Sequence, residues 1–543
     1  MVPHGPGPHA TQNAAGEVPG TRRRRFLLEG AVTIVPGIAI LAARAAATLA
    51  AGLHVGCLLL LSGLVGLIAM FRAARLPAIR WTRVTADRIT CAADMIWSMP
   101  ATRFPTAIAL AGLLGLAGCT GTHPMMPTPS LYTGAQAKPL FTEETAALRT
   151  PPLDLLYITD RAPAQGPDQP EPYTSERSRS EAFGSTTVLF GEGMTWDALA
   201  KQSLEPERTP SIDLTLGPTR EIGRFPPIPY GLAVTGAGLT RAPAVVDAHE
   251  AATRALQAEV ARRLAASPRK EVVLFVHGVD NTFQDAALTM GELCHFLGRE
   301  FVCGIFTWPA AGTRGVLFGY EEDYESSLFA VEHLRKTIRA IAGTPGLQKI
   351  HLIAHSRGTD ILLAALSDLN VEAYMQQTTI AQRFKVANVV LMAPDLDPDV
   401  AVAKVFKVWS DPDIPYGPAP NPRVVLETQQ VHTTLYVSPE DKALATSGWL
   451  FGSLVRLGRM EKGSFTPDQL EHLRAIGFVD VIEVQGKTDL IGHSYFVTNP
   501  EVSSDLVALL RYGLGPDDPG RALEPDEKPF WRIPAKGASG AAH

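Results

Sequence analysis

The feature that most limits what this chain can fold into is a serine between a strand pattern and a helical pattern. Residues 349–354 are mostly apolar, which is typical of a strand buried on both faces, and residues 357–369 carry apolar side chains at helical spacing. Ser356 stands between them, with the small residues Ala354 and Gly358 two positions away on either side. A serine at such a strand-to-helix corner is strained and exposed, so the pattern predicts a nucleophile elbow.

The elbow motif departs from the common Gly-x-Ser-x-Gly form by one methyl group, at Ala354. In isolation, Ala-x-Ser-x-Gly is a weak signal, and a serine at a helix N-cap is the alternative interpretation. The position of the motif, directly after a predicted buried strand and directly before a predicted helix, favours the nucleophile.

Strand and helix patterns alternate along the chain from residue 271 onward. Alternation of this kind is typical of an α/β fold with a doubly wound, mainly parallel sheet. The predicted strands are 271–276, 302–308, 386–392, 433–437 and 479–484, and the predicted helices are 282–298, 321–341, 399–409 and 501–510. Further strand patterns at 153–158, 185–190 and 211–216 and a helix at 247–265 precede them.

The general base and its acid partner are expected after the serine, because a sheet with this kind of elbow orders its catalytic residues as serine, acid, histidine. His493 follows the last predicted strand, whereas His432 opens a strand, so we assign His493 as the base. Asp441 follows the strand before that one and is the preferred acid. Asp395 follows the preceding strand and is the alternative acid, since either strand end can bring a carboxylate to the imidazole.

Backbone amides for an oxyanion hole can also be assigned. In acyl transfer, N–H donors must point at the negative charge that develops on the carbonyl oxygen. One donor is expected from Arg357, the residue after the nucleophile, and the other from Val279, in the loop after strand 271–276. Gly278 lets that loop approach closely, and His277 is interpreted as a structural residue that braces it.

Composition argues against several other classes of protein. A net charge of −6 and a pI near 6.2 give no sign of a nucleic-acid partner. The five cysteines show no C-x-x-C pair and no zinc-ligand spacing, so neither a metal nor a cofactor is predicted. Cys294 and Cys303 can pair in an oxidising compartment, and two buried thiols are an equally good interpretation. Nothing in the sequence indicates an oligomeric state.

The first 94 residues are directed toward a membrane after a disordered start. Four arginines at 22–25 precede an apolar block at 26–71, in which residues 45–71 are enough to span a bilayer and residues 27–43, with a glutamate and a proline, are a weaker candidate. Basic residues on both sides of the block predict a hairpin with both ends in the cytoplasm. Because a signal-peptide pattern follows at residues 95–118, our interpretation is that translation begins at Met95 or Met99 and that residues 1–94 are a gene-start artefact; a double-spanning anchor is the alternative.

A second membrane signal, of the signal-peptide type, occupies residues 95–118. Arg103 precedes a short apolar core that ends in the sequence Leu-Ala-Gly before Cys119. This ending resembles the lipobox of bacterial lipoproteins, in which the cysteine is acylated, so Cys119 is the predicted lipidation site. A chance cysteine in an Ala/Leu-rich helix is the alternative. We further predict a tether at 119–150, the main domain at 151–515 and a disordered tail at 516–543.

Several stretches in combination resemble an uncharacterised bacterial family of alpha/beta hydrolases, many of whose members are identified as envelope lipoproteins. The resemblance covers residues 153–512 and implies the alpha/beta-hydrolase fold and hydrolase activity, without a substrate. The family usually has an apolar residue where Arg357 stands, which implies a changed charge at the mouth of the site. The stretches are YITDR (157–161), FVHGVDN (275–281), IAHSRG (353–358), MAPDLD (392–397), YVSPEDKAL (436–444) and GHSY (492–495).

The sequence therefore predicts a serine hydrolase that acts by nucleophilic acyl transfer on a small-molecule or lipid ester. An amidase or peptidase with the same triad is an open alternative, and so is a non-catalytic envelope assembly protein on a hydrolase scaffold. The expected location is the bacterial cell envelope, with a lipid or hydrophobic anchor in the membrane and the hydrolase domain outside the cytoplasm.

Overall fold

The computed structural model describes most of the chain after residue 122. The predictions for residues 1–94, for the signal peptide at 95–118 and for Cys119 lie outside the described residues. The structure describes residues 123–134, 137–142, 148–166, 169–311, 315–410, 431–451, 455–486 and 492–534.

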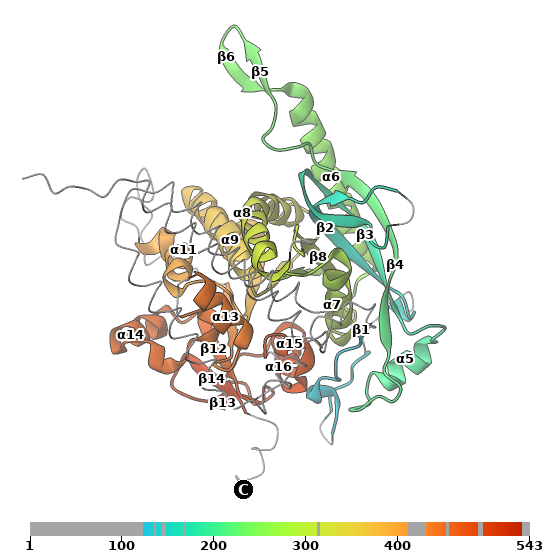
Figure 1. The fold of residues 1–543 in the computed structure, drawn as a ribbon, viewed down its shortest axis with the longest axis vertical. Coiled ribbons are helices and arrows are strands. Elements are labelled where there is room, and N and C mark those ends of the chain that lie inside the picture. Colours follow the sequence, from blue (N-terminus) through green and yellow to red (C-terminus); the bar gives the residue numbers. More distant parts are fainter. Residues whose placement is uncertain are drawn as a thin grey trace, which may run out of the picture. The chain divides into compact units, whose positions relative to one another are not determined.

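Within the described residues, twelve strands form one sheet in the order β1-β4-β3-β2-β8-β7-β9-β10-β11-β12-β14-β13 (Figure 1). From β2 through β14, every pair of neighbouring strands is parallel. The predicted α/β fold with a mainly parallel, doubly wound sheet is thereby confirmed. The parallel strands are β2 (Leu153–Pro163), β8 (Val302–Thr307), β7 (Glu271–Val276), β9 (Lys349–His355), β10 (Val386–Met392), β11 (His432–Val437), β12 (Val479–Val484) and β14 (Phe530–Ile533).

Helices cover both faces of the sheet, which divides the hydrophobic core in two. In β7, Val273 and Phe275 belong to one cluster, and Val272 and Leu274 belong to the other. Strands buried on both faces have nearly continuous apolar sequences, which is why the sequence predicts these strands closely. The first cluster contains α7 (Phe283–Phe296), α15 (Tyr495–Thr498) and α16 (Pro500–Leu510), and the second contains α6 (Pro243–Ala266), α8 (Gly315–Ala342), α9 (Gly358–Met375) and α11 (Pro398–Ser410).

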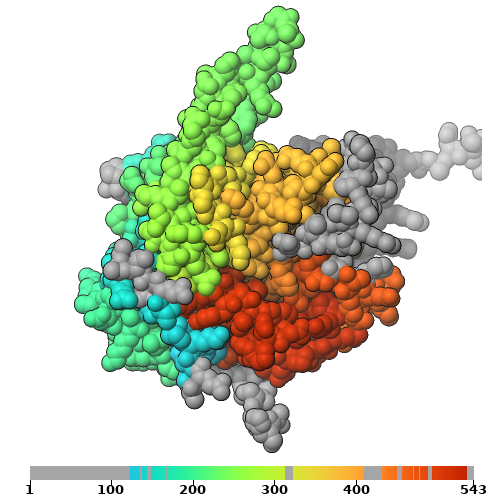
Figure 2. All heavy atoms as spheres, turned by 180° about the vertical axis from the view of Figure 1, so that it is seen from behind, coloured from blue at the N-terminus to red at the C-terminus, as the bar shows by residue number. Residues whose placement is uncertain are grey.

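An antiparallel extension continues the sheet beyond β2. It consists of β3 (Tyr173–Phe190), β4 (Asp213–Arg224) and the short edge strand β1 (His123–Pro124). Between β4 and α6 the chain forms a separate two-stranded hairpin, β5 (Leu232–Thr235) and β6 (Gly238–Arg241). The hairpin projects away from the body of the domain (Figures 1 and 2).

Short elements complete the described part of the chain. They are α5 (Trp196–Gln202), α10 (Ile380–Phe384), α13 (Lys442–Phe451), α14 (Pro467–Ile476), β13 (Glu524–Pro525) and three 3₁₀ turns, Ser130–Tyr132, Leu457–Arg459 and Lys462–Ser464. Among all the described helices, none is long and apolar enough to cross a membrane.

The segment 119–150, predicted to be a tether, packs against the domain in its described part. Its strand β1 pairs with β4, and Met126 and Tyr132 are buried. The Met126 amide donates to the Glu292 carboxylate at 2.7 Å, and the Tyr132 hydroxyl donates to the Phe296 carbonyl at 2.6 Å. The prediction is wrong here because it rested on a composition rich in proline, threonine and glycine. A few apolar side chains are enough to order such a segment when the domain offers them a buried site.

The segment 516–543, predicted to be a disordered tail, adds a strand to the sheet. β14 pairs in parallel with β12, and Trp531 is buried with its indole N–H donating to Asp480 at 3.2 Å. Residues 535–543 lie outside the described residues. A strand of four residues is too short to show a periodicity, and its order depends on the neighbouring strand edge that it covers.

Cys294 and Cys303 form a disulfide, a pairing that the sequence left open. The bond joins the last turn of α7 to the second residue of β8, and the two Cα atoms are 6.1 Å apart. That separation is ordinary for a disulfide. The link therefore ties a helix of the first core cluster directly to a central strand.

Candidate active site

Ser356 occupies the corner between β9 and α9 in a left-handed backbone conformation. Its φ angle is 52°, which is uncommon for a residue with a side chain and marks local strain. Its amide donates to the Met392 carbonyl at 2.9 Å, and its carbonyl accepts a hydrogen bond from the Thr359 hydroxyl at 2.7 Å. These bonds hold the strained residue on both sides, as a nucleophile elbow requires.

Glycine is needed at two positions where the elbow meets the loop after β7. A Cβ atom at Gly358 would lie 2.4 Å from the His277 carbonyl oxygen and 2.7 Å from the Val276 carbonyl oxygen. A Cβ atom at Gly278 would lie 2.7 Å from Cβ of Ser356. The first turn of α9 and the end of β7 can therefore approach each other only because these two positions lack a side chain.

The structure brings Asp441 and His493 together at the same edge of the sheet. Asp441 follows β11 and is fully buried, whereas the His493 side chain, just before α15, is 16% exposed. Nδ1 of His493 lies 2.7 Å from Oδ2 of Asp441, and the Leu444 amide donates to Oδ1 at 2.9 Å. With its Nδ1 proton directed at the carboxylate, the imidazole presents Nε2 as a proton acceptor.

His355, which precedes Ser356, contacts the loop that carries His493. Its Nε2 donates to the His493 carbonyl oxygen at 3.2 Å, and the two imidazole ring centres are 4.7 Å apart. Burial, reinforced by the neighbouring His493, holds the pKa of His355 well below its usual value, so the ring stays neutral and keeps this bond near neutral pH. His355 was not among the residues predicted for the site, although its place beside the elbow serine could have indicated a role.

Asp395, the alternative acid, lies in a different set of contacts. Ser447 donates to its Oδ1 at 2.7 Å, and the guanidinium groups of Arg456 and Arg357 lie 3.3 Å and 3.8 Å from its carboxylate oxygens. Asp395 is 2% exposed, so this carboxylate is a buried anion beside two buried cations. Its contacts connect the elbow helix α9 with α13 and with the chain that follows α13.

The Arg357 side chain is buried, which corrects the expectation that it changes the charge at the mouth of the site. Its guanidinium lies 3.4 Å from the Asp360 carboxylate and packs over the Tyr324 ring at 5.2 Å. Nearby carboxylates thus balance its charge inside the protein. The Arg357 backbone stands at the N-terminal end of α9, as its N-cap residue.

His277 braces the loop after β7 from inside the protein. Its Nδ1 donates to the Gly278 carbonyl at 2.8 Å, its Nε2 accepts from the Trp308 amide at 3.1 Å, and its ring stacks on the Trp308 indole. Burial, with a smaller effect of the nearby Arg161, holds the pKa of His277 well below its usual value. The neutral ring fixes the approach of the loop that carries Val279, which is half-buried.

Arg161, in the YITDR stretch, is a second residue near the site for which the sequence predicted no role. It follows the parallel part of β2 and is 1% exposed. Its guanidinium donates to the Asn281 carbonyl at 2.6 Å, the Ala310 carbonyl at 3.1 Å and the Thr307 hydroxyl at 2.9 Å. Burial lowers the pKa of Arg161 to about 10, which leaves it cationic at neutral pH. One buried cation therefore joins the loops after β7 and β8.

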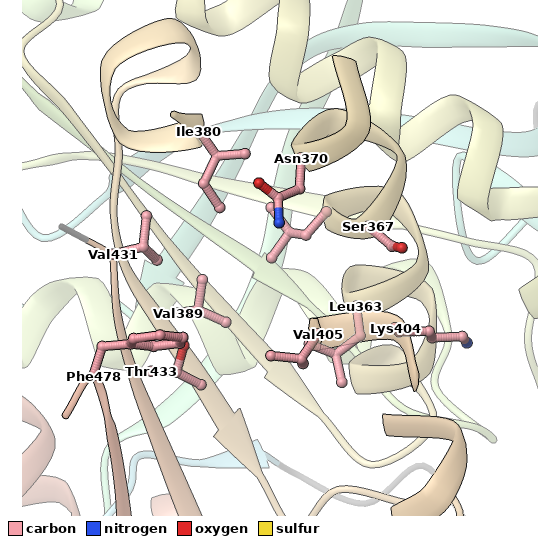
Figure 3. Close-up of a pocket in the computed structure, with 11 residues that line it drawn as sticks. Leu363, Ser367, Asn370, Ile380, Val389, Lys404, Val405, Val431, Thr433 and Phe478 are labelled. Carbon is pink, nitrogen blue, oxygen red and sulfur yellow. The ribbon is translucent and has the colours of Figure 1, made fainter. Parts of the chain in front are cut away.

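A small cavity of about 50 Å³ lies away from this site, between α9, α11 and the sheet (Figure 3). Its lining is mainly apolar and includes Leu363, Val405 and Val389. Thr433 and Phe478, which also line it, stand at the amino ends of β11 and β12, whereas Ser356 follows the carboxyl end of β9. Among the described residues, no group of three or more His, Cys, Asp or Glu could hold a metal ion.

A mainly parallel sheet with a strained serine between a central strand and the next helix defines the class, the alpha/beta-hydrolase fold. Residues 252–511 match the model of a family described as "Alpha/beta hydrolase of unknown function (DUF900)". The resemblance predicted from the sequence motifs is therefore confirmed over that range. Comparison with curated proteins gave no match.

Three of the solved structures to which this chain is similar are described as a hydrolase, an esterase and a carboxylesterase. A predicted CIB-like hydrolase from Thermoplasma acidophilum is 14% identical, with a TM-score of 0.23, over 45% of this chain and 88% of that one. An esterase from Pyrobaculum calidifontis is 14% identical, with a TM-score of 0.23, over 46% and 78%. The carboxylesterase CesB from Bacillus subtilis is 12% identical, with a TM-score of 0.22, over 46% and 87%. These identities are too low to transfer a substrate.

We predict that Gly358→Ala destabilises the protein by about 1–3 kcal/mol, because the new methyl group meets two backbone carbonyls and forces the elbow apart. The free energy of unfolding in urea measures the effect. Gly463→Ala is the matched control, since a Cβ atom there meets open space. Equal stability of the two variants would contradict the close approach of α9 to β7.

Proposed function

We propose that this protein is a serine hydrolase that cleaves carboxylic esters through Ser356, His493 and Asp441. The observation that carries the proposal is the left-handed φ angle of Ser356 at the end of a central strand. Strain of this kind persists where the surrounding structure holds it, and such positions cluster at active sites. The pair of Asp441 and His493, 2.7 Å apart beside the same elbow, supplies the groups that would activate the hydroxyl.

In the proposed first half of the reaction, Nε2 of His493 accepts the proton of the Ser356 hydroxyl as Oγ attacks the ester carbonyl carbon. The carbonyl π electrons move to the oxygen, whose negative charge is stabilised by the backbone amides of Val279 and Arg357. The tetrahedral intermediate collapses, His493 gives its proton to the leaving alcohol oxygen, and an acyl-enzyme remains on Ser356.

In the second half, water repeats these steps from the other side. His493 takes a proton from water as the water oxygen attacks the acyl carbon, and then returns a proton to Oγ of Ser356. The carboxylic acid product leaves and the free enzyme is restored. Asp441 holds the imidazole in the required tautomer and stabilises the imidazolium that forms twice in each cycle.

We also propose that the hydrolase works at the bacterial cell envelope, with lipidated Cys119 as its anchor. Disulfides persist in oxidising compartments outside the cytoplasm, and the bond between Cys294 and Cys303 supports such a location. A cysteine that carries two or three acyl chains satisfies the two-signal requirement for stable membrane attachment. The substrate would then be a small-molecule or lipid ester at or outside that membrane.

The first prediction for this function concerns the nucleophile. A fluorophosphonate probe is expected to label Ser356, and Ser356→Ala is expected to abolish labelling and hydrolysis of p-nitrophenyl esters. Ser367→Ala, on the same helix α9, is the control and should retain both. Parallel assays with p-nitroanilides separate an esterase from an amidase. Unchanged ester turnover by a folded Ser356→Ala variant would overturn the assignment.

The second prediction distinguishes the two candidate acids. Asp441→Asn should lower kcat by roughly a thousandfold or more, because the imidazole loses the carboxylate that fixes its tautomer. Asp395→Asn should cost much less in kcat and should instead lower stability, because two buried guanidinium groups lose an anionic partner. Steady-state kinetics and urea unfolding of both variants measure this. The reverse order of the kcat losses would make Asp395 the acid.

The third prediction concerns the anchor. Mass spectrometry of the N-terminal peptide of the protein from native cells should find a mature chain that begins at a diacylated or triacylated Cys119. A Cys119→Ala variant should lose the modification and leave the membrane fraction. An unmodified Cys119 within a continuous peptide that reaches residues before 95 would contradict lipidation and favour the upstream double-span anchor.

A further inference from the structure

The hairpin of β5 and β6 projects from the folded body of the domain (Figures 1 and 2), and its large apolar side chains are exposed. Val234 is 85% exposed, Leu239 is 69% exposed and Leu232 is 60% exposed. Single exposed apolar residues are common on protein surfaces, but three on one small hairpin form a contiguous patch. A two-stranded hairpin is at best marginally stable in water, so contact of this patch with another surface would stabilise it.

The three apolar residues lie on one face of the hairpin. Leu232 and Val234 are two positions apart on β5, so their side chains point to the same side. The register pairs Val234 with Leu239 and Leu232 with Arg241, and directly paired residues share a face. The opposite face carries only small or hydroxylated residues, namely Ala233, Thr235, Gly238 and Thr240.

The charge of this part of the chain is unusual for an exposed segment. From Phe225 to Val246, the sequence contains a single charged residue, Arg241, and no carboxylate. Arg241 stands at the base of the apolar face, and the turn at the tip is uncharged. A patch with an apolar tip, a cationic base and no acid complements a surface whose interior is apolar and whose rim is anionic.

The base of the hairpin is fixed to the domain by several contacts. The Ala242 amide donates to the Gly231 carbonyl at 3.1 Å, closing the hairpin directly before α6. The Tyr230 hydroxyl lies 3.2 Å from Nδ1 of His249 on α6, and the Arg179 guanidinium donates to the Ile228 carbonyl at 2.5 Å. The hairpin is therefore mounted on α6 and β3 in a defined direction.

The hairpin follows the carboxyl end of β4, and the candidate active site also lies at the carboxyl ends of the parallel strands. β4 is antiparallel to β3, which is antiparallel to β2, so β4 runs parallel to β2, β7 and β9. Its carboxyl end, from which the chain enters the hairpin, therefore lies at the same edge as the carboxyl end of β9, where Ser356 follows.

We propose that the β5–β6 hairpin docks on an anionic phospholipid surface. A second copy of the chain fits poorly, because four residues per strand give a face of only about 14 Å by 10 Å, whereas a stable protein interface needs about 800 Å² per partner. Insertion of a few apolar side chains at the headgroup boundary needs no such area, and the absence of carboxylates from Phe225 to Val246 removes repulsion from lipid phosphates.

The depth of insertion follows from the backbone. Both edges of the two-stranded hairpin carry unpaired N–H and C=O groups, which hydrocarbon cannot satisfy. The side chains of Val234 and Leu239 therefore enter the acyl boundary while the backbone remains among headgroups and water. Arg241, nearer the domain on the same face, lies at the level of the lipid phosphates.

One orientation of the domain follows if Cys119 is also lipidated. The chain after Cys119 enters the fold at β1, beside the amino end of β4, and the hairpin continues from the carboxyl end of β4. Both attachments reach one bilayer when the β4 edge of the sheet lies along the membrane. In a consequence that rests on the proposed function, Ser356, which follows β9 five strands from β4, is held within about 24 Å of the lipid surface and takes esters that leave it.

Hydrogen exchange of the full chain, read by mass spectrometry, tests the docking without any turnover. With vesicles of phosphatidylglycerol and phosphatidylcholine, the amides of residues 232–241 should exchange more slowly than without vesicles. The slowing should be smaller with vesicles of phosphatidylcholine alone. With the mixed vesicles, Arg241→Gln should reduce the slowing to the level seen with phosphatidylcholine alone. Val234→Ser with Leu239→Ser should abolish it, whereas Ala233→Ser with Thr240→Ser, on the opposite face, should retain it. Unchanged exchange in β7 confirms that each variant is folded.

Three outcomes would overturn the proposal: no slowing with either vesicle, equal loss in both double variants, or slowing that grows with protein concentration in the absence of lipid, which would indicate a second copy. None of these readings depends on Ser356, so failure of the proposed catalytic function leaves the result unaffected. Hydrolysis of a vesicle-borne ester relative to a soluble one then measures the consequence for the enzyme separately.

Discussion

Two segments of backbone, the end of β7 and the first turn of α9, approach each other more closely than any residue with a side chain would allow. The missing Cβ of Gly358 lets α9 begin against the His277 carbonyl, and the missing Cβ of Gly278 lets the β7 loop lie against Ser356. The strained φ angle of Ser356 persists because this contact and the β9–β10 ladder hold it from both sides. The Arg161 guanidinium also holds this loop, because it donates a hydrogen bond to the Asn281 carbonyl.

Asp441 and Asp395 follow neighbouring strands and look alike in sequence, but the groups that surround their carboxylates differ. Asp441 contacts an imidazole and a helix-start amide, so its environment suits the orientation of a histidine. Asp395 lies beside two buried guanidinium groups, which makes it a counter-ion that holds α9 against the chain around α13. The desolvation of each charge is offset by the partners that surround it, and those partners determine what each carboxylate can do.

Two features away from the candidate active site agree with the proposed location at the cell envelope. The Cys294–Cys303 disulfide suits an oxidising compartment, and the β5–β6 hairpin presents an apolar face with a single cation. Neither the disulfide nor the hairpin belongs to the proposed triad of Ser356, His493 and Asp441. The hairpin and the entry of the chain at β1 lie along the same strand, β4, which relates the two membrane attachments geometrically.

Local sequence patterns were enough to predict the central strands, the order of strands and helices, the strand-to-helix corner at Ser356 and the strand ends after which Asp441 and His493 stand. Those predictions depend on apolar periodicity and on chain order, which are properties of contiguous residues. Composition misjudged the segments around Tyr132 and Trp531, because a short segment becomes ordered through burial against distant residues. The contacts of His355 and of Arg161 likewise join positions far apart in the chain, and only tertiary packing brings such positions into contact.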